Sequence, residues 1–216
     1  MAGDASDPKV LLERALGGDC GALAELFERH RGRLEQMVRL RLDRRLQGRL
    51  DPADVPQEMY LDVARRFAEY APDPALPFYL WLRFLAGQRL VDLHRQHLGA
   101  KIRNAGLEVS LYRGDFPRAS SASLAEMLLL GRLTTASRAA IRAETQRRVQ
   151  EALNSMDPMD REVLVLRHFE MLSNEETAQV LGLKRQAASN RHARALKRLK
   201  EILAQLPGFG DSSSGR

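Results

Sequence analysis

Apolar residues recur every three or four positions along most of the chain, and no stretch shows the sustained alternation of a half-buried strand. The pattern predicts an all-α protein. A first helix is expected over residues 10–16, because Gly17 and Gly18 break the pattern there. Asp19 is then placed to cap a second helix, which the pattern allows to continue to Leu46. The apolar stripe of this second helix consists of Leu23, Leu26, Phe27, His30 and Leu34.

A third helix is expected after the turn-forming residues Asp51 and Pro52. Two starts are open for it. If Asp54 is the cap, Pro56 lies in the first turn, where a missing N–H does no harm; if Asp51 is the cap, one helical hydrogen bond is lost. We therefore favour Asp54. The inward face of this helix carries Val55, Met59, Val63 and Phe67.

Three prolines punctuate residues 70–77, so this segment is expected to be a stiff loop. The helix expected after it, to about His97, begins aromatic and becomes basic, which is a first indication of nucleic-acid binding. Its basic residues, with those that follow it, are Arg89, Arg95, Lys101 and Arg103. Of its four aromatic side chains, we expect two in the core and two closer to the surface, respectively Trp81 with Phe84 and Phe78 with Tyr79.

Residues 105–143 differ in composition, because Gly, Ser and Pro separate short apolar pieces. We interpret this segment as a linker that leaves room for one short helix. The helical pattern returns over residues 144–206, and residues 207–216, rich in Gly and Ser, are expected to form a flexible tail. With a flexible N-terminus over residues 1–8 and a first domain over residues 9–104, the pattern predicts two small helical domains joined by a long linker.

Residues 172–200 predict a helix-turn-helix. Ser173, with Glu176 three residues later, is a capping-box pattern, and Gly182 can supply the left-handed residue that ends this first helix. A second helix is expected to start near Lys184. Its buried stripe is expected to contain, as packing residues, Ala188, His192, Ala195, Leu199, Ile202 and Leu203.

The second helix begins with exposed amide, hydroxyl and guanidinium groups, which are the groups that hydrogen-bond base edges in a major groove. These side chains, with their neighbours, are Lys184, Arg185, Gln186, Ser189, Asn190 and Ala193. Cations on the flanks could neutralise phosphates, namely Arg191, Arg194, Lys197 and Arg198. Because residues 184–200 contain seven Lys or Arg and no acid, we expect this helix to approach DNA. The alternative is a solvated basic helix that closes a bundle.

The overall charge agrees with an anionic partner. The 34 Lys and Arg against 28 Asp and Glu give a net charge of +6, which favours nucleic acid or an acidic protein surface. No run approaches the roughly 18 apolar residues of a transmembrane helix, and the start MAGDASDPKV lacks the order of a signal peptide, so a cytoplasmic protein without direct membrane insertion is expected. The single cysteine, Cys20, excludes an internal disulfide, and no cofactor is expected.

Two groups of motifs, one in each half of the chain, resemble conserved regions of a known protein family. One is MDPMDREVLVLRHFEMLSNEETAQVLGLKRQAASNRHARALKRLKE in the C-terminal half; the other is ALGGDCGALAELF, DPADVPQEMYL and PFYLWLRFLAGQRLVD in the N-terminal half. They are similar to the fourth and second conserved regions of the extracytoplasmic-function (ECF) group of bacterial sigma factors, in the sigma-70 family. Helix-turn-helix motifs alone are common, whereas both regions in this order are not. Nearly the whole chain takes part.

The resemblance implies a subunit that binds core RNA polymerase, melts and reads the minus-ten promoter element, and reads the minus-thirty-five element with the second helix of the helix-turn-helix. In such factors a DVxQE-type helix binds the coiled coil of the clamp of the largest polymerase subunit. The matching positions here are Asp54, Gln57, Glu58 and Tyr60, with Pro56 departing from the usual aliphatic residue. The linker of such factors enters the active-site and RNA-exit channels, and an anti-sigma factor is a typical partner.

The family also implies two DNA-binding sets. The loop over residues 70–77 matches the part that captures a base flipped from the melted minus-ten element. The minus-ten set comprises Asp73, Phe78, Tyr79, Gln88, Arg89, His94, Arg95, Lys101 and Arg103. The minus-thirty-five set comprises Lys184, Arg185, Gln186, Ser189, Asn190, Arg191, Arg194, Lys197 and Arg198.

Two other functions compete with this interpretation. A stand-alone helix-turn-helix regulator would explain the basic helix but not the acidic helix or the proline loop. An enzyme is a third hypothesis, because His94 and His97 lie three residues apart, although no third metal ligand is evident nearby and no phosphate-binding Gly loop or nucleophile elbow is found.

Overall fold

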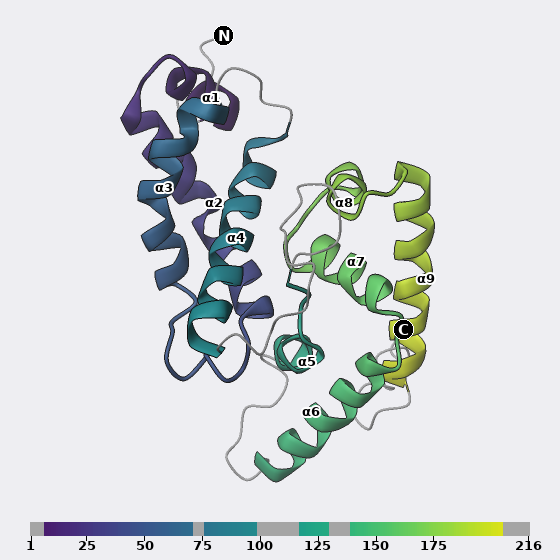
Figure 1. Ribbon diagram of the computed structural model, residues 1–216. Coiled ribbons are helices and arrows are strands. Elements are labelled where there is room, and N and C mark those ends of the chain that lie inside the picture. Colours follow the sequence, from purple (N-terminus) through teal and green to yellow (C-terminus); the bar gives the residue numbers. More distant parts are fainter. Residues whose placement is uncertain (1–6, 71–75, 99–116, 130–138, 205–216) are drawn as a thin grey trace, which may run out of the picture. The chain divides into compact units, whose positions relative to one another are not determined.

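The computed structural model describes residues 7–70, 76–98, 117–129 and 139–204 (Figure 1). These residues form nine helices and no strand, which confirms the all-α prediction. The chain divides into two compact units, Met1–Leu111 and Tyr112–Arg216, and each is considered by itself. In the part of the chain that the structure describes, no helix is both long and apolar enough to cross a membrane.

The first unit begins with two capped helices: Asp7 caps the first, which starts at Pro8, two residues before the expected Val10, and Asp19 caps the second, as the sequence predicts. The Asp19 carboxylate accepts a hydrogen bond from the backbone N–H of Ala22 at 3.0 Å and pairs with the Arg14 guanidinium at 2.7 Å. Gly18, with a φ of 94°, makes the turn before this cap. The helices of the unit are α1 (Pro8–Leu16), α2 (Cys20–Arg41), α3 (Asp54–Tyr70) and α4 (Phe78–Leu98).

Helix α2 stops at Arg41, short of the Leu46 that the pattern allowed. The reason lies in Asp43, whose carboxylate accepts hydrogen bonds from both the backbone N–H and the side chain of Arg45, at 2.9 and 3.0 Å. Such local bonds offer the backbone an alternative to the helix. The Arg45 guanidinium also lowers the pKa of Asp43 to about 2, so this turn is held by an ionised carboxylate.

Helix α3 begins at Asp54 itself, one residue before the start that an Asp54 cap would give. Asp51 organises the preceding turn, because its carboxylate accepts from the N–H of Ala53 at 2.9 Å and its carbonyl accepts from the N–H of Asp54 at 3.0 Å. Pro56 therefore lies in the first turn, as expected.

Helices α2, α3 and α4 pack side by side around an aromatic cluster (Figure 1). Tyr70 and Trp81 lie with ring centroids 4.9 Å apart, and Phe67 and Phe78 join them. The expectation that Phe78 and Tyr79 lie close to the surface is wrong, since they are only 6% and 3% exposed. Phe78 is buried by this cluster, whereas the Tyr79 ring packs on His30 at 5.4 Å between centroids and under the Arg33 guanidinium at 3.7 Å. Trp81 is buried as predicted, whereas the side chain of Phe84 is partly exposed.

The second unit starts within the segment interpreted as a linker. Helix α5 there is largely buried and packs against α6. Arg161 of α7 links α5 to α6, because its guanidinium donates to the Ser121 hydroxyl of α5 at 2.9 Å and to the Leu153 carbonyl of α6 at 2.8 Å. The helices of this unit are α5 (Ser121–Leu129), α6 (Ala139–Asn154), α7 (Pro158–His168), α8 (Asn174–Leu181) and α9 (Arg185–Ala204).

The connection between α7 and α8 contains a strained residue. Met171 has a φ of 56°, a left-handed conformation that a β-carbon disfavours, and its side chain is 67% exposed. We expect Met171→Gly to raise the free energy of unfolding by about 0.5–1 kcal/mol, because relief of the strain exceeds the entropy that glycine adds to the unfolded chain. Urea titration measures this. Met171→Ala keeps the β-carbon and should give no gain; an equal gain from both variants would contradict the explanation.

Candidate nucleic-acid interface

The turn between α8 and α9 has the geometry that the sequence predicts. The Ser173 hydroxyl accepts from the N–H of Glu176 at 3.1 Å, and the Glu176 carboxylate accepts from the N–H of Ser173 at 2.7 Å. Gly182 ends α8 with φ 62° and ψ 33°, in the left-handed region. Across the turn, the Asn174 side chain donates to the Arg185 carbonyl at 3.0 Å. The helix-turn-helix prediction is confirmed.

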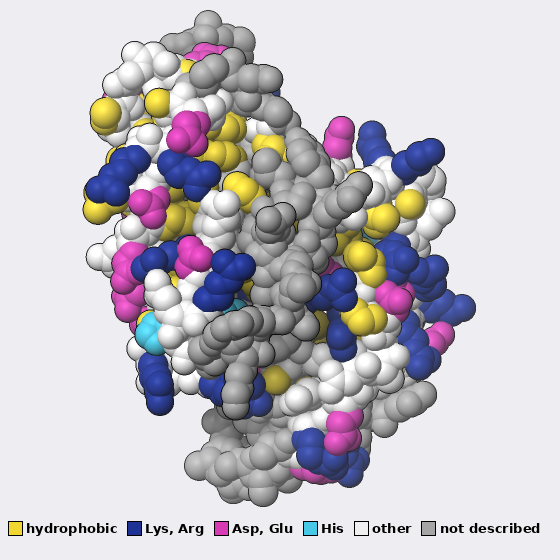
Figure 2. Space-filling model, viewed as in Figure 1, with side chains coloured by type: hydrophobic (Ala, Val, Ile, Leu, Met, Phe, Trp, Pro, Cys, Tyr) yellow, Lys and Arg dark blue, Asp and Glu magenta, His cyan; other side chains and the backbone are white. Residues whose placement is uncertain are grey.

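The face of α9 expected to meet bases is exposed. Its residues are Arg185, Gln186, Ser189, Asn190 and Ala193. The Gln186 side chain donates to the Asn190 side chain at 3.0 Å, one helical turn further on, so the two amides are already ordered with respect to each other. On the opposite side, Ala188, Ala195 and Ile202 are buried. Lys and Arg side chains gather over the surface of α9 in Figure 2.

The flanking cations fall into two groups. Lys184 and Lys197 are exposed. Arg191 instead points to α7, where it lies 2.6 Å from the Asp160 carboxylate and 3.2 Å from that of Asp157. Other contacts are looser, with Arg194 at 3.2 Å from Asp160 and Arg198 at 3.5 Å from Glu201. The pattern of charges could not show that Arg191 is paired, because Asp160 and Asp157 lie 31 and 34 positions earlier in the chain.

His192 joins α9 to the end of α7. Its Nε2 lies 2.8 Å from Nε2 of His168, so one ring donates and the other accepts. Burial lowers the pKa of His192, and the charges of His168 and Arg167 lower it further. Burial and Arg167 lower the pKa of His168 in the same way. The neutral pair is therefore the form that this packing favours.

A second candidate surface lies on α3. Asp54, Gln57 and Glu58 are exposed, and Leu61, one turn further on, is 63% exposed. Tyr60 turns partly inward, where its ring centroid lies 5.2 Å from that of Phe27. The sequence-based prediction did not include Leu61 in this surface. Its position one helical turn after Gln57 and Glu58 would have placed it on the same face.

Residues of α3 and α4 contact each other, and in the first of these pairs the two residues are assigned to different partners. Arg89 donates to the Glu58 carboxylate at 2.7 Å, and Arg66 donates to the Gln88 side chain at 2.8 Å. Nε2 of His94 accepts from the N–H of Asp43 at 3.2 Å, and burial lowers the pKa of His94. The neutral imidazole is thereby favoured over the cation that would contact a phosphate.

The remaining minus-ten residues are only partly described. Arg95 is exposed near the end of α4. Asp73, Lys101 and Arg103 lie outside the described residues. At the end of α3, the Tyr70 hydroxyl donates to the Leu76 carbonyl at 2.9 Å.

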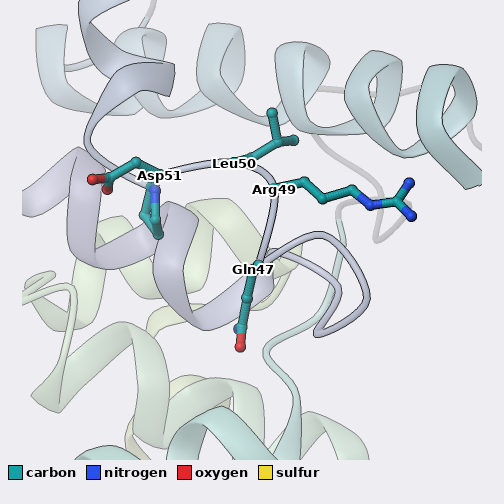
Figure 3. A pocket seen from close by; sticks show the side chains of 6 residues that line it. Gln47, Arg49, Leu50 and Asp51 are labelled. Carbon is teal, nitrogen blue, oxygen red and sulfur yellow. The ribbon is translucent and has the colours of Figure 1, made fainter.

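A recess in the connection between α2 and α3 offers no comparable site. Its lining includes Gln47, Arg49, Leu50 and Asp51. In Figure 3 these four side chains point in different directions. Polar groups that diverge cannot hold one ligand together.

Comparison with known proteins gives the chain its family. Residues 152–201 match the family described as Sigma-70, region 4. The ECF RNA polymerase sigma factor SigD of Mycobacterium tuberculosis (strain ATCC 25618 / H37Rv) is 30% identical over 205 residues, which cover 94% of this chain and 87% of SigD. The chain belongs to the ECF group of sigma factors. This decides against the stand-alone regulator, since ECF sigma factors are transcription initiation factors.

Other relatives of this ECF sigma factor agree. SigK of Mycobacterium sp. (strain KMS) is 26% identical over 201 residues, which cover 92% of this chain and 91% of SigK. Among solved structures, that of CnrH in complex with the cytosolic domain of CnrY is similar, with a TM-score of 0.52 and 25% identity, over 92% of this chain and 97% of that one.

The histidine pair predicts a pH dependence for this sigma factor. Both histidine pKa values are lowered from the ordinary 6.5, so as the pH falls the unfolded chain binds protons before the folded chain does. The contribution of the pair to the free energy of unfolding is therefore complete above about pH 6.5 and is lost as the pH falls below that value. His192→Gln should flatten this loss between about pH 7 and 5, as followed by thermal unfolding with circular dichroism. His97→Gln, at an exposed position on α4, is the control. An unchanged pH profile in His192→Gln would contradict the role of the pair.

Proposed function

We propose that this sigma factor reads the minus-thirty-five element with the exposed start of α9. The observation that carries the proposal is the acid-free polar face after the left-handed turn at Gly182. A guanidinium such as that of Arg185 can bond guanine through two atoms, and an amide such as that of Asn190 can bond adenine in the same way. Lys184 and Lys197 flank this face as exposed cations, where they would neutralise phosphates and set the register.

The acidic face of α3 is the proposed binding site for core RNA polymerase. Asp54, Gln57 and Glu58 offer acceptors to a basic surface, and Leu61 adds apolar area beside them. Tyr60 would contribute through the exposed edge of a ring that otherwise packs on Phe27.

The minus-ten element is assigned to α4 and the loop before it. Gln88, Arg89 and Arg95 are the described residues that would contact DNA. Phe78 and Tyr79 are buried, so we assign them a supporting role beneath the loop in place of stacking on a base. Asp73, Lys101 and Arg103 complete the proposed set.

Four further assignments follow from this function. The chain performs no covalent chemistry itself, and it works in the cytoplasm, where polymerase and promoter DNA are found. An anti-sigma factor is a proposed regulator, supported by the likeness to CnrH, whose structure contains the cytosolic domain of CnrY. Residues 9–104 and 144–206 are the proposed polymerase-binding and upstream DNA-binding domains, with α5 packed against α6 of the second.

Binding to core RNA polymerase tests the α3 assignment. We expect Asp54→Ala and Glu58→Ala each to weaken binding about tenfold, or about 1.4 kcal/mol, because each removes an acceptor from the contact. Fluorescence anisotropy of the labelled chain measures this. Glu69→Ala, which removes an exposed acid from the last turn of the same helix, should bind as the wild type does. If all three variants weakened binding equally, the effect would come from the net charge of the helix, and the proposed contact through Asp54 and Glu58 would be contradicted.

Promoter selectivity tests the α9 assignment. Arg185→Ala should weaken use of the cognate upstream element by about 1–3 kcal/mol and relax selectivity at one position, because a base contact is lost. Run-off transcription from promoters varied over the upstream element measures this. Lys197→Ala should weaken all promoters alike. A uniform loss in Arg185→Ala as well would mark it as a phosphate contact.

A further inference from the structure

A nearly buried carboxylate on α7 holds two arginines of α9. Asp160 is only 7% exposed. Arg191 donates to its Oδ1 at 2.6 Å, and Arg194 donates to Oδ1 at 3.2 Å and to Oδ2 at 3.3 Å. Asp157, which caps α7, adds a second carboxylate 3.2 Å from Arg191. These contacts lie within one turn of the exposed residues that begin α9.

The apolar contact between α9 and its neighbours would not by itself fix the rotation of α9 about its axis. At its centre are Ala188 and Ala195, whose methyl groups let the helices approach closely but offer little shape to resist turning. At 3.6 residues per turn, Arg191 lies about 60° to one side of Ala188 and His192 about 40° to the other. Arg191 meets Asp160, and His192 meets His168. Polar contacts therefore bracket the alanines on both sides.

We infer that Asp160 is a positioning residue for DNA reading, and that Arg191 acts by holding Asp160 and not by contacting a phosphate. The inference rests on the proposed role of α9. The residues that would meet bases are exposed on the far side of the same helix, so a rotation of α9 would move them away from the base edges. A buried carboxylate without its arginine is costly, which is why the pair keeps one geometry.

This arrangement makes a prediction about salt. Each phosphate contact contributes about −0.9 to the slope of log affinity against log salt concentration. Arg191, half-buried against two carboxylates, should contribute nothing to that slope. Lys197, exposed on the same helix, should contribute about one such step and nothing to sequence discrimination.

The test uses the full chain bound to core RNA polymerase of its source. The wild-type complex first selects an upstream element from a library of duplexes randomised in that region. Affinity is then measured at several salt concentrations for the selected duplex and for the same duplex with that element scrambled. Arg191→Lys keeps the charge but not the paired geometry, Asp160→Asn keeps the shape but not the charge, and Lys197→Met is the matched control.

The expected results differ for the three variants. Arg191→Lys should lose about tenfold in discrimination between the duplexes with its salt slope unchanged. Asp160→Asn should lose discrimination at least as strongly, with a steeper slope because two arginines are released. Lys197→Met should keep discrimination with a slope shallower by about 1. A fourth variant, Arg191→Met, removes the charge and should leave the salt slope unchanged. Wild-type discrimination in both Arg191→Lys and Asp160→Asn, or a slope shallower by about 1 in Arg191→Met, would overturn the inference. A wild-type complex that selects no element would instead overturn the proposed function of α9.

Discussion

The proposed DNA-reading surface depends on the backbone conformation of Gly182. With φ at 62°, this residue ends α8 and starts the turn over residues 182–184 that leads into α9, and the N–H of Leu183 donates to the Ala178 carbonyl at 2.8 Å. A β-carbon at this position would cost about 1–2 kcal/mol. The capping box at the other end of α8 fixes where the helix starts, so its length of 8 residues is set at both ends. The direction in which α9 leaves the turn follows from these two local constraints.

Local constraints of this kind are what the sequence predicts well. Ser173, Glu176, Gly182 and Asp19 act within a few residues of themselves, so their types and spacing were enough to place the helix ends. The alternation of exposed and buried positions on α9 was likewise predictable from a period of 3.6 residues.

The sequence-based prediction was wrong where residues distant in the chain determine burial or ion pairing. Phe78 and Tyr79 begin a helix, a position that suggested the surface, yet Phe67, Tyr70 and His30 from other helices enclose them. Arg191 and Arg194 belong to an acid-free stretch, yet Asp160 meets them from α7. No pattern along the chain shows which acid lies beside which base after folding, so the split of the candidate site into free cations and paired cations needed the structure.

The ion pair between Glu58 and Arg89 couples the two proposed binding surfaces of the first unit. Glu58 is proposed to bind polymerase and Arg89 to bind DNA. In the free chain the two side chains form an ion pair at 2.7 Å. A polymerase group that takes Glu58 leaves Arg89 available to a phosphate, and a phosphate that takes Arg89 leaves Glu58 available to polymerase. The two affinities must then rise together by the same factor. Because the pair is solvent-exposed and worth about 0.2–1 kcal/mol, that mutual enhancement is at most about fivefold. The free chain would therefore hold DNA slightly less well than the polymerase-bound chain, through exchange of one ion pair and without a change of fold.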